Sequence, residues 1–248
     1  MRKRDLALGT VALLILWQGL SWLLRTDVLP GPWEVAQAFV RAVPRGLARH
    51  FVVSGYRVLA GIVLAMLTAV PVGLILGQSP ALNRIFSPII YITYPIPKIV
   101  LLPVILLLFG IGDTSKIFII FLILFFQILV VVRDQAVALR PELIYSVRSL
   151  GAGRRALFRF VYAPASVPAA LTALRVSIGT AVAVLFFAES FATNSGLGYY
   201  IIVDSWGRLA YADMYAGVVA LSLLGLILYF VVDWLERVLA PWMFLRDA

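Results

Sequence analysis

Long apolar stretches separated by short polar connections run through this sequence and limit what it can fold into. Hydrophobic residues make up 62% of the chain and charged residues 13%, and the mean hydropathy is +1.00, far from the composition of a water-soluble domain. A helix needs about 20 apolar residues to cross the hydrocarbon core, so the chain has room for about six spans with short connections. We therefore expect an all-α, polytopic membrane protein without a separate soluble domain.

Charge and residue usage exclude several classes of function. The net charge of +9 does not call for nucleic acid as a partner, because Lys and Arg also collect beside the cytoplasmic ends of membrane helices. The absence of cysteine excludes disulfides and thiolate metal sites, and a single histidine, His50, cannot build a histidine-rich metal site. We expect no metal site, and we expect His50 in a loop or at an interface.

The first 54 residues have the pattern of a retained signal anchor. A basic flank precedes an apolar run at 6–24, and no A-x-A cleavage site follows it. The stretch 25–54 is more polar and contains three prolines, which predicts a periplasmic loop with an amphipathic helix at about 32–43. Residues 1–54 are thus expected to form an anchor helix followed by a periplasmic amphipathic segment.

Five further spans are predicted in residues 55–248, at about 55–76, 85–109, 117–132, 165–187 and 214–239. Gly73 and Gly77 have the spacing at which another helix can approach closely, either within the chain or in a dimer. Four prolines interrupt 85–109, and such breaks are tolerated where the freed backbone is buried in protein or lines a watery cavity. This broken span is therefore a candidate pathway element.

Lys and Arg are more frequent in the segments that lie on the same side as the N-terminus, although a basic cluster at 41–49 lies on the other side. By the positive-inside rule, both termini are expected in the cytoplasm. The only long inner connection then covers 133–164.

This inner loop predicts two helices joined by a glycine turn. Pro141 and Glu142 suit a first helical turn, and Gly151 and Gly153 suit the end of that helix. "RRALFRFVY" then begins another short helix. Such a helix–turn–helix with apolar and basic residues can dock into a groove on a partner protein. The alternative is a basic loop on anionic lipid headgroups, which leaves the two glycines unexplained.

The loop resembles the cytoplasmic signature loop of permease subunits in binding-protein-dependent ABC importers, whose pattern is Glu-Ala-Ala, three residues, Gly, nine residues, then Ile-x-Leu-Pro. Gly151 takes the glycine place, and Val161, Ala163 and Pro164 take the last three. Where Glu-Ala-Ala is usual, this chain has Tyr145, Ser146 and Val147, so the acidic residue is missing. The resemblance implies an ATPase-coupling loop formed by Tyr145, Ser146, Val147, Ser149, Leu150, Gly151, Arg154, Leu157 and Pro164.

Four stretches narrow the resemblance to the nitrate, sulfonate and taurine branch of these permeases: 54–79, 95–116, 149–179 and 196–201. This branch implies a type I ABC importer permease (MetI-like) fold over 55–248 in a bacterial inner membrane. It also implies a second permease copy, two cytoplasmic ATPase subunits and an extracytoplasmic substrate-binding protein. The chain lacks the phosphate-binding pattern G-x-x-x-x-G-K-[ST], so we expect ATP and Mg on the partner ATPase and no cofactor in this chain.

Charged residues within predicted spans are costly and usually face the bundle interior or water. Lys98 follows Pro97 in the broken span, where it either attracts an anionic substrate or pairs with Glu189 as a structural tie. Arg175 is expected to make a helix-to-helix or intersubunit contact. The candidate pathway and gate residues are Tyr94, Pro97, Lys98 and Glu189.

The main prediction is a permease subunit that imports a small solute, with a nitrate-, sulfonate-, taurine- or bicarbonate-like anion favoured. Related permeases also serve vitamin precursors of the pyrimidine or riboflavin type, so this alternative stays open. A membrane-embedded enzyme or assembly factor is disfavoured, because Lys98, Asp113 and Glu189 are scattered and no nucleophile has a recognisable spacing to them. We therefore expect no catalytic residue in the chain.

Overall fold

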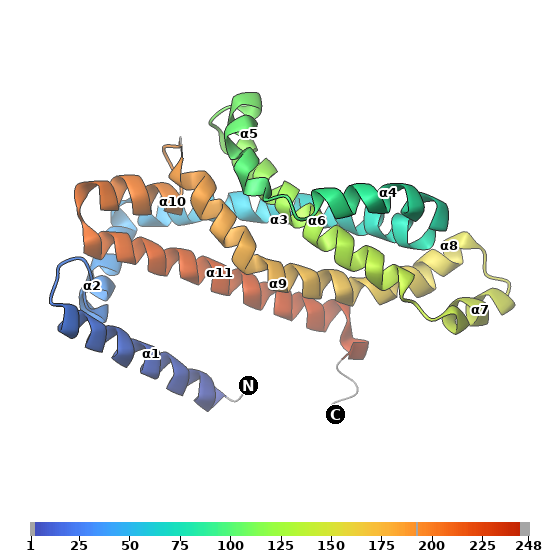
Figure 1. Cartoon of the computed structure of the whole chain (residues 1–248). Coiled ribbons are helices and arrows are strands. Elements are labelled where there is room, and N and C mark those ends of the chain that lie inside the picture. Colours follow the sequence, from blue (N-terminus) through green and yellow to red (C-terminus); the bar gives the residue numbers. More distant parts are fainter. Residues whose placement is uncertain (1–2, 192, 244–248) are drawn as a thin grey trace. The chain divides into compact units, whose positions relative to one another are not determined.

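The computed structural model describes residues 3–191 and 193–243, and every regular element in that part is a helix. The chain forms two compact units, Met1–Gly55 with Phe186–Leu224, and Tyr56–Leu185 with Gly225–Ala248. Three long helices, α3, α9 and α11, contribute residues to both units. Figure 1 labels the helices along the chain.

Four helical stretches of the described part are long and apolar enough to cross a membrane: Pro32–Gln78, Asp113–Val137, Arg155–Ser190 and Tyr211–Leu239. A bent pair, Pro80–Thr93 with Lys98–Phe109, is a fifth candidate, and its two helices meet at 80°. The expected N-terminal span is present as the shorter apolar helix Leu8–Leu24. The prediction of an all-helical, polytopic membrane protein is confirmed, with four to five full-length spans where about six were expected.

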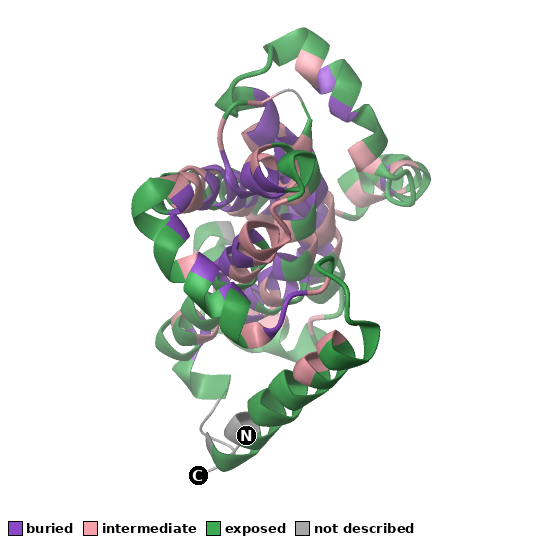
Figure 2. Cartoon of the chain, turned by 90° about the vertical axis from the view of Figure 1, so that its left-hand side faces the viewer, coloured by how far each residue is buried: buried purple, intermediate pink, exposed green. Residues whose placement is uncertain are grey.

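In the first unit, α1 (Lys3–Leu24) presents most of its apolar side chains to the outside (Figure 2), as a helix in contact with lipid does. The connection that follows folds back on α1, because Trp17 Nε1 donates to Pro30 O at 3.1 Å and Ser21 Oγ donates to Leu29 O at 3.0 Å. The C-terminal end of α1 is thereby fixed to the start of the next helix.

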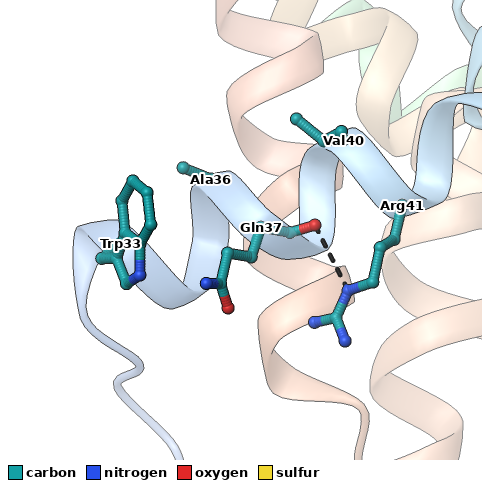
Figure 3. Close-up of a pocket in the computed structure, with 5 residues that line it drawn as sticks. All are labelled: Trp33, Ala36, Gln37, Val40 and Arg41. Atoms are coloured by element: carbon teal, nitrogen blue, oxygen red, sulfur yellow. Dashed lines mark hydrogen bonds between the residues drawn. The ribbon is translucent and has the colours of Figure 1, made fainter.

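The amphipathic helix predicted at 32–43 is confirmed as α2 (Pro32–Ala42), which buries Val35, Ala38 and Ala42. Its outer side carries Trp33, Ala36, Gln37, Val40 and Arg41, and Arg41 Nε donates to Gln37 O at 3.3 Å (Figure 3). An exposed tryptophan and valine beside an arginine suit the boundary between lipid headgroups and acyl chains.

Residues 43–54 of the predicted loop at 25–54 are also helical, which corrects the sequence prediction. After η1 (Val43–Leu47), where Gly46 has φ 130° and kinks the chain, α3 (Ala48–Gln78) begins. His50 therefore lies in a long helix and not in a loop. The three prolines misled the prediction because Pro32 stands in the first turn of a helix and Pro44 at a kink, positions that need no backbone N–H.

The first unit also contains α10 (Leu197–Tyr199), η4 (Tyr200–Ser205), η5 (Trp206–Arg208) and the start of α11 (Tyr211–Leu239). Gly217 of α11 faces the side chains of Tyr200 and Ile201, where an added Cβ would lie within 2.8 Å of both. This close approach holds the short helices against α11.

In the second unit, α3 packs closely on α6 (Asp113–Val137) through its glycines. A Cβ on Gly73 would lie 3.0 Å from Leu129 O, and one on Gly77 would lie 2.5 Å from Ala136 Cβ. The Gly73–Gly77 spacing therefore serves packing within the chain, the first of the two interpretations left open by the sequence.

The broken span consists of α4 (Pro80–Thr93), η2 (Lys98–Leu101) and α5 (Leu102–Phe109), with the break at Tyr94–Pro97. The interruption predicted from the four prolines is confirmed at Pro95 and Pro97, whereas Pro88 lies inside α4 and Pro103 in the first turn of α5. Gly110 (φ 77°) ends α5 before α6 begins.

The predicted inner loop contains α7 (Pro141–Ser149), α8 (Arg154–Leu157) and η3 (Phe158–Tyr162), followed by α9 (Ala163–Ser190). The first helix and its glycine turn are confirmed. The second helix is not short, because α8 and η3 continue into α9 without a break, giving one helical stretch from Arg155 to Ser190. The described chain ends in η6 (Pro241–Met243).

Candidate functional site

The α7–α8 segment of the second unit is the first candidate site. Pro141 stands in the first turn of α7, and Glu142 places its carboxylate at the positive end of the helix. At the other end, Gly151 N donates to Arg148 O at 2.9 Å, and Gly151 has φ 79°. That backbone conformation favours glycine, so the tight turn predicted from the sequence is present.

The predicted apolar ridge of this segment is split between exposed and buried side chains. Leu150 is 86% exposed and Phe160 is 65% exposed, whereas Leu157 and Val161 are buried in the second unit. Leu157 therefore packs inside, and Leu150 is the apolar side chain that the turn presents outward. Of the other predicted coupling residues, Tyr145, Ser146 and Ser149 are exposed and Val147 and Pro164 are half-buried, while the side chain of Arg154 lies outside the described residues.

Lys98 is bound to the break in the bent pair. Its Nζ donates to the carbonyls of Thr93 at 3.0 Å, Tyr94 at 3.1 Å and Ile96 at 3.4 Å, and it lies 4.4 Å from the ring centroid of Phe126. An ammonium has three donors, and here three backbone carbonyls at the break accept them. Within its unit, Lys98 thus acts as a cap on the end of α4.

A cavity of about 350 Å³ adjoins this break, and its lining is mostly apolar. Three predicted pathway residues, Tyr94, Pro97 and Lys98, lie together along it. Polar groups enter the lining from two other helices of the same unit, at Gln127 and Thr180. Such a concave, largely apolar site with a few polar groups is typical of small-molecule binding.

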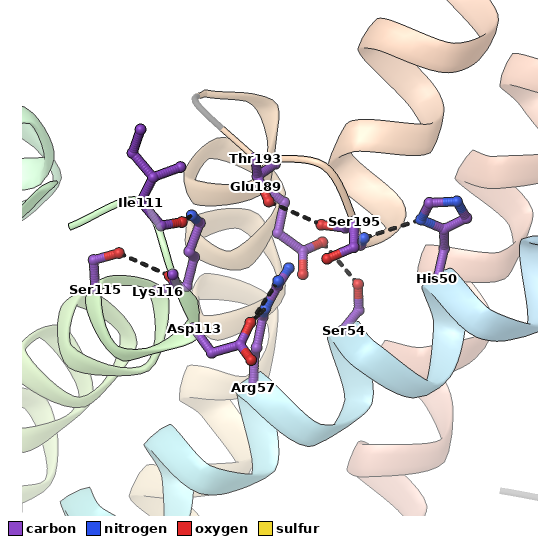
Figure 4. Close-up of polar contacts among 12 residues, drawn as sticks. His50, Ser54, Arg57, Ile111, Asp113, Ser115, Lys116, Glu189, Thr193 and Ser195 are labelled. Carbon is purple, nitrogen blue, oxygen red and sulfur yellow. Dashed lines mark hydrogen bonds and ion pairs between the residues drawn. The ribbon is translucent and has the colours of Figure 1, made fainter.

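Glu189, the fourth predicted pathway residue, is fully buried in the first unit, whereas Lys98 belongs to the second unit. Glu189 Oε2 accepts a hydrogen bond from Ser54 Oγ at 2.7 Å and one from Gly198 N at 3.1 Å. Ser54 Oγ in turn accepts from Leu197 N at 2.7 Å, and His50 Nδ1 accepts from Gly196 N at 3.0 Å (Figure 4).

Three consecutive amides, those of residues 196–198, are therefore accepted by side chains of His50, Ser54 and Glu189. These amides form the N-terminus of α10, where backbone N–H groups lack helical partners and a carboxylate is favoured by the helix dipole. We call His50, Ser54, Glu189 and residues 196–198 the amide latch. It ties α10 to α3 and α9.

Space around the latch admits only glycine at two positions. A Cβ on Gly196 would lie 2.2 Å from Glu189 Cδ, and one on Gly198 would lie 2.5 Å from Phe186 O.

Two tyrosines lie beside His50: the ring centroids of Tyr199 and Tyr200 are 5.8 and 5.6 Å from the imidazole centroid. Burial, and next the negative charge of Asp213, raise the pKa of Tyr200 above its ordinary value. The tyrosine hydroxyl therefore stays neutral at physiological pH.

Sequence reasoning singled out Glu189 but missed its partners. His50 and Ser54 are four residues apart and share one face of a helix, yet they stand more than 130 residues from the loop that they bind. The signal that could have pointed to these partners is the Ser-Gly-Leu-Gly run at 195–198. It lies only a few residues after Glu189, across one short loop.

The second unit holds further buried charges. Arg57 is 3% exposed and forms an ion pair with Asp113 at 2.6 Å, which joins α3 to the first turn of α6 (Figure 4). Lys116 is fully buried, and its ammonium donates to Ile111 O. Buried charges require such partners, because desolvation is costly.

Charges also join α9 to α11. Arg175 Nη1 lies 3.1 Å from Asp233 Oδ1 and 2.9 Å from Glu236 Oε2. Thr172 Oγ1 donates to Glu236 Oε1 at 3.0 Å, and Arg237 pairs with Asp233 at 3.0 Å. The helix-to-helix contact predicted for Arg175 is confirmed.

Comparison with known proteins adds a decisive observation. Residues 61–245, about three quarters of the chain, match the model of the family described as "binding-protein-dependent transport system inner membrane component". The chain belongs to this family. The matched region includes the α7–α8 segment, the bent pair and most of the amide latch. Only His50 and Ser54 of the latch precede it.

Curated relatives of this permease agree with that assignment. It is 32% identical to the taurine transport system permease protein TauC of Escherichia coli (strain K12), over 97% of this chain and 90% of the relative. It is 28% identical to the nitrate import permease protein NrtB of Synechococcus elongatus, over 92% and 86%. The putative aliphatic sulfonates transport permease protein SsuC of Bacillus subtilis is 27% identical, over 93% and 84%.

A chain of the MetNI methionine ABC transporter in an inward-facing conformation has the same fold, with a TM-score of 0.68 at 22% identity, over 80% of this chain and 98% of that one. The MetI-like fold expected from the sequence is thus confirmed. As a family member, the permease is a membrane component of an ABC transport system and not an enzyme, and ATP is hydrolysed by a separate subunit. Family membership implies an ATPase and a substrate-binding protein as partners.

Proposed function

We propose that this permease forms the translocation pathway of an ATP-driven importer for a small solute with an anionic oxygen group, such as a sulfonate or nitrate. Relatives named for taurine, nitrate and aliphatic sulfonates support this solute class. A relative named for formylaminopyrimidine, 25% identical over 93% of this chain, supports a ring-type vitamin precursor as the second candidate. ATP and Mg are assigned to the partner ATPase, and no cofactor is assigned to this chain.

The continuity of α8, η3 and α9 is the observation that carries the proposed mechanism. A force applied to the α7–α8 turn would move one helical stretch of 36 residues, because no flexible loop interrupts it. Leu150 and Tyr145, exposed on this segment, are the proposed contacts with the ATPase. Movement of α9 would then open the pathway alternately to the two sides of the membrane.

We assign residues 1–54 to the anchor and periplasmic segment and 55–248 to the permease domain, with both termini in the cytoplasm of a bacterial cell. The exposed side of α2, with Trp33 and Val40, then rests at the outer surface of the inner membrane.

The proposed solute class is tested by transport. We would purify the permease with its ATPase, reconstitute both in proteoliposomes, and supply the binding protein from outside. ATP-dependent uptake of radiolabelled taurine or nitrate supports the anion, and uptake of a formylaminopyrimidine alone supports the second candidate. Failure of any ATPase to co-purify would overturn the permease role.

We propose that two copies of this chain form a homodimer with the translocation pathway at the subunit interface. Large apolar side chains on α5 and α9 are unusually exposed in the single chain, with Leu107 at 86% and Val176 at 78%. The chain has no cysteine, so single cysteines at these positions report only on themselves. We expect disulfide cross-linking at one or both, and none at Leu13 on α1 as a control. Absence of cross-linking at every position along α5 and α9 would contradict the homodimer.

The second expected result concerns Lys98. Replacing it by methionine removes the donors to three carbonyls in the break, so we expect a loss of about 1.5–3 kcal/mol in the free energy of unfolding. Lys98→Gln, which keeps one donor group, should lose less. Thermal unfolding and uptake would be measured together. Loss of uptake with unchanged stability would instead assign the ammonium to the solute.

A further inference from the structure

A second cavity, of about 480 Å³, lies in the second unit at the corner between α3 and α4. It adjoins the α7–α8 segment and is separate from the residues that line the cavity at the break. Its polar lining comes from four residues on three parts of the fold: Gln78, Ser79, Arg148 and Tyr162. Ile75, Pro80 and Leu157 make up the remainder.

The polar side chains of this cavity carry hydrogen-bond donors that have no acceptor partner among the described residues. Gln78 Nε2 is buried and has no hydrogen-bond partner among the described residues. In the same described part, neither the Arg148 guanidinium nor the Tyr162 hydroxyl has a hydrogen bond or ion pair. Ser79 Oγ accepts from Leu82 N, which leaves its own proton available. Of these donors, Gln78 Nε2 is the one that is buried without a partner, whereas Arg148 is exposed. A buried donor left unsatisfied is costly, so the cavity favours an occupant that accepts a hydrogen bond from Gln78.

The charge of the lining has one sign. None of the described lining residues carries a carboxylate, while Arg148 contributes a permanent positive charge. Ser79 is the N-cap of α4, a helix of 14 residues with Pro80 in its first turn, so the positive end of the helix dipole adds to that charge. Two hydroxyls, from Ser79 and Tyr162, together with an amide and a guanidinium around one space match the oxygens of a phosphate or sulfonate group.

We infer that this cavity is a binding site for an oxyanion, a phosphate or sulfonate group. The group would accept from Arg148, Gln78 and Tyr162 together, and so would join α7 and η3 to the α3–α4 corner. Its source is either a free anion in solution or the phosphate of a phospholipid headgroup. If the proposed coupling role of the α7–α8 segment holds, occupancy would stiffen the segment through which the ATPase acts.

The test uses the full-length chain in a neutral detergent, with inorganic phosphate as the probe and the thermal unfolding midpoint as the readout. We expect phosphate to raise the midpoint in a saturable manner at constant ionic strength. Arg148→Gln should weaken this effect about tenfold, as loss of a charge-assisted hydrogen bond does. Tyr162→Phe removes only a hydroxyl and should weaken it less while leaving the fold intact. Arg155→Gln, with the same charge change in the same segment but outside the lining, is the matched control.

A lipid arm separates the two sources. Native mass spectrometry would count the phosphatidylglycerol and phosphatidylcholine molecules retained by the wild type and by the Arg148→Gln, Tyr162→Phe and Arg155→Gln variants. Retention of phosphatidylglycerol that falls in Arg148→Gln but not in Arg155→Gln assigns the site to a headgroup. A phosphate effect without such retention assigns it to a free anion. Equal phosphate response and equal lipid retention in all four proteins would overturn the site, whatever the outcome of the transport assays.

Discussion

Replacing Gly151 by valine is expected to uncouple ATP hydrolysis from transport. Gly151 has φ 79°, a conformation that costs an L-residue about 1–2 kcal/mol and a β-branched one more. Among the described residues, no atom outside the immediate chain neighbours lies within 4 Å of an added Cβ, so the cost comes from the backbone and not from a clash. The turn would open, and Leu150 would leave its outward position. Solute-stimulated ATP hydrolysis should fall roughly five- to thirtyfold.

The chain offers a matched control for this change. Gly153 lies two residues on, also has open space at its Cβ, and does not have a positive φ. Gly153→Val should therefore leave stimulation near the wild-type level, and Gly151→Asn should retain more of it than Gly151→Val, because asparagine tolerates a left-handed conformation. The variants would be reconstituted with ATPase and binding protein, and recovery of the complex measured beside hydrolysis. Wild-type recovery and stimulation in Gly151→Val would show that this turn is not the coupling element.

Replacing Gly196 by alanine is expected to break the amide latch and abolish transport. Gly196 has φ 111° and ψ 165°, a region that is essentially restricted to glycine, and its Cβ would lie 2.2 Å from Glu189 Cδ. Moving the loop to relieve this clash would separate the amides of residues 196–198 from their three acceptors. Each buried group left unsatisfied costs about 1–3 kcal/mol, so we expect the free energy that holds this segment folded to fall by several kcal/mol.

Gly207→Ala is the control, because a Cβ on Gly207 would make only an ordinary contact, 3.5 Å from Ile202 O, a few residues further along the same segment. Limited proteolysis would report opening of residues 193–209, and uptake would be measured in the same preparations. Ser54→Ala, which removes one hydroxyl and creates no clash, should produce a milder form of the same effect. A protease-resistant, active Gly196→Ala would mean that the latch does not hold this segment.

Local chemistry accounts for the parts of the fold that could be predicted. The prolines around Lys98 predicted a break in a span, since proline removes a helical donor wherever it stands in a helix interior. The same rule failed at Pro32 and Pro44, which occupy a helix start and a kink, so a helical region was taken for a loop. Whether a proline ends a helix depends on its position in the helix, and that depends on what the neighbouring segments pack against.

The sequence by itself determined that this chain is a polytopic helical membrane protein with a glycine turn in its α7–α8 segment. Those properties follow from apolar length, from charge placement and from the backbone freedom of single residues, all of which are local. Only the tertiary structure decided that Leu157 faces inward, that Lys98 caps a broken helix, and that Glu189 holds the N-terminus of α10 together with His50 and Ser54. The partners of a buried charge come from packing: Ser54 and Glu189 are 135 residues apart, and no spacing along the chain records which segments meet.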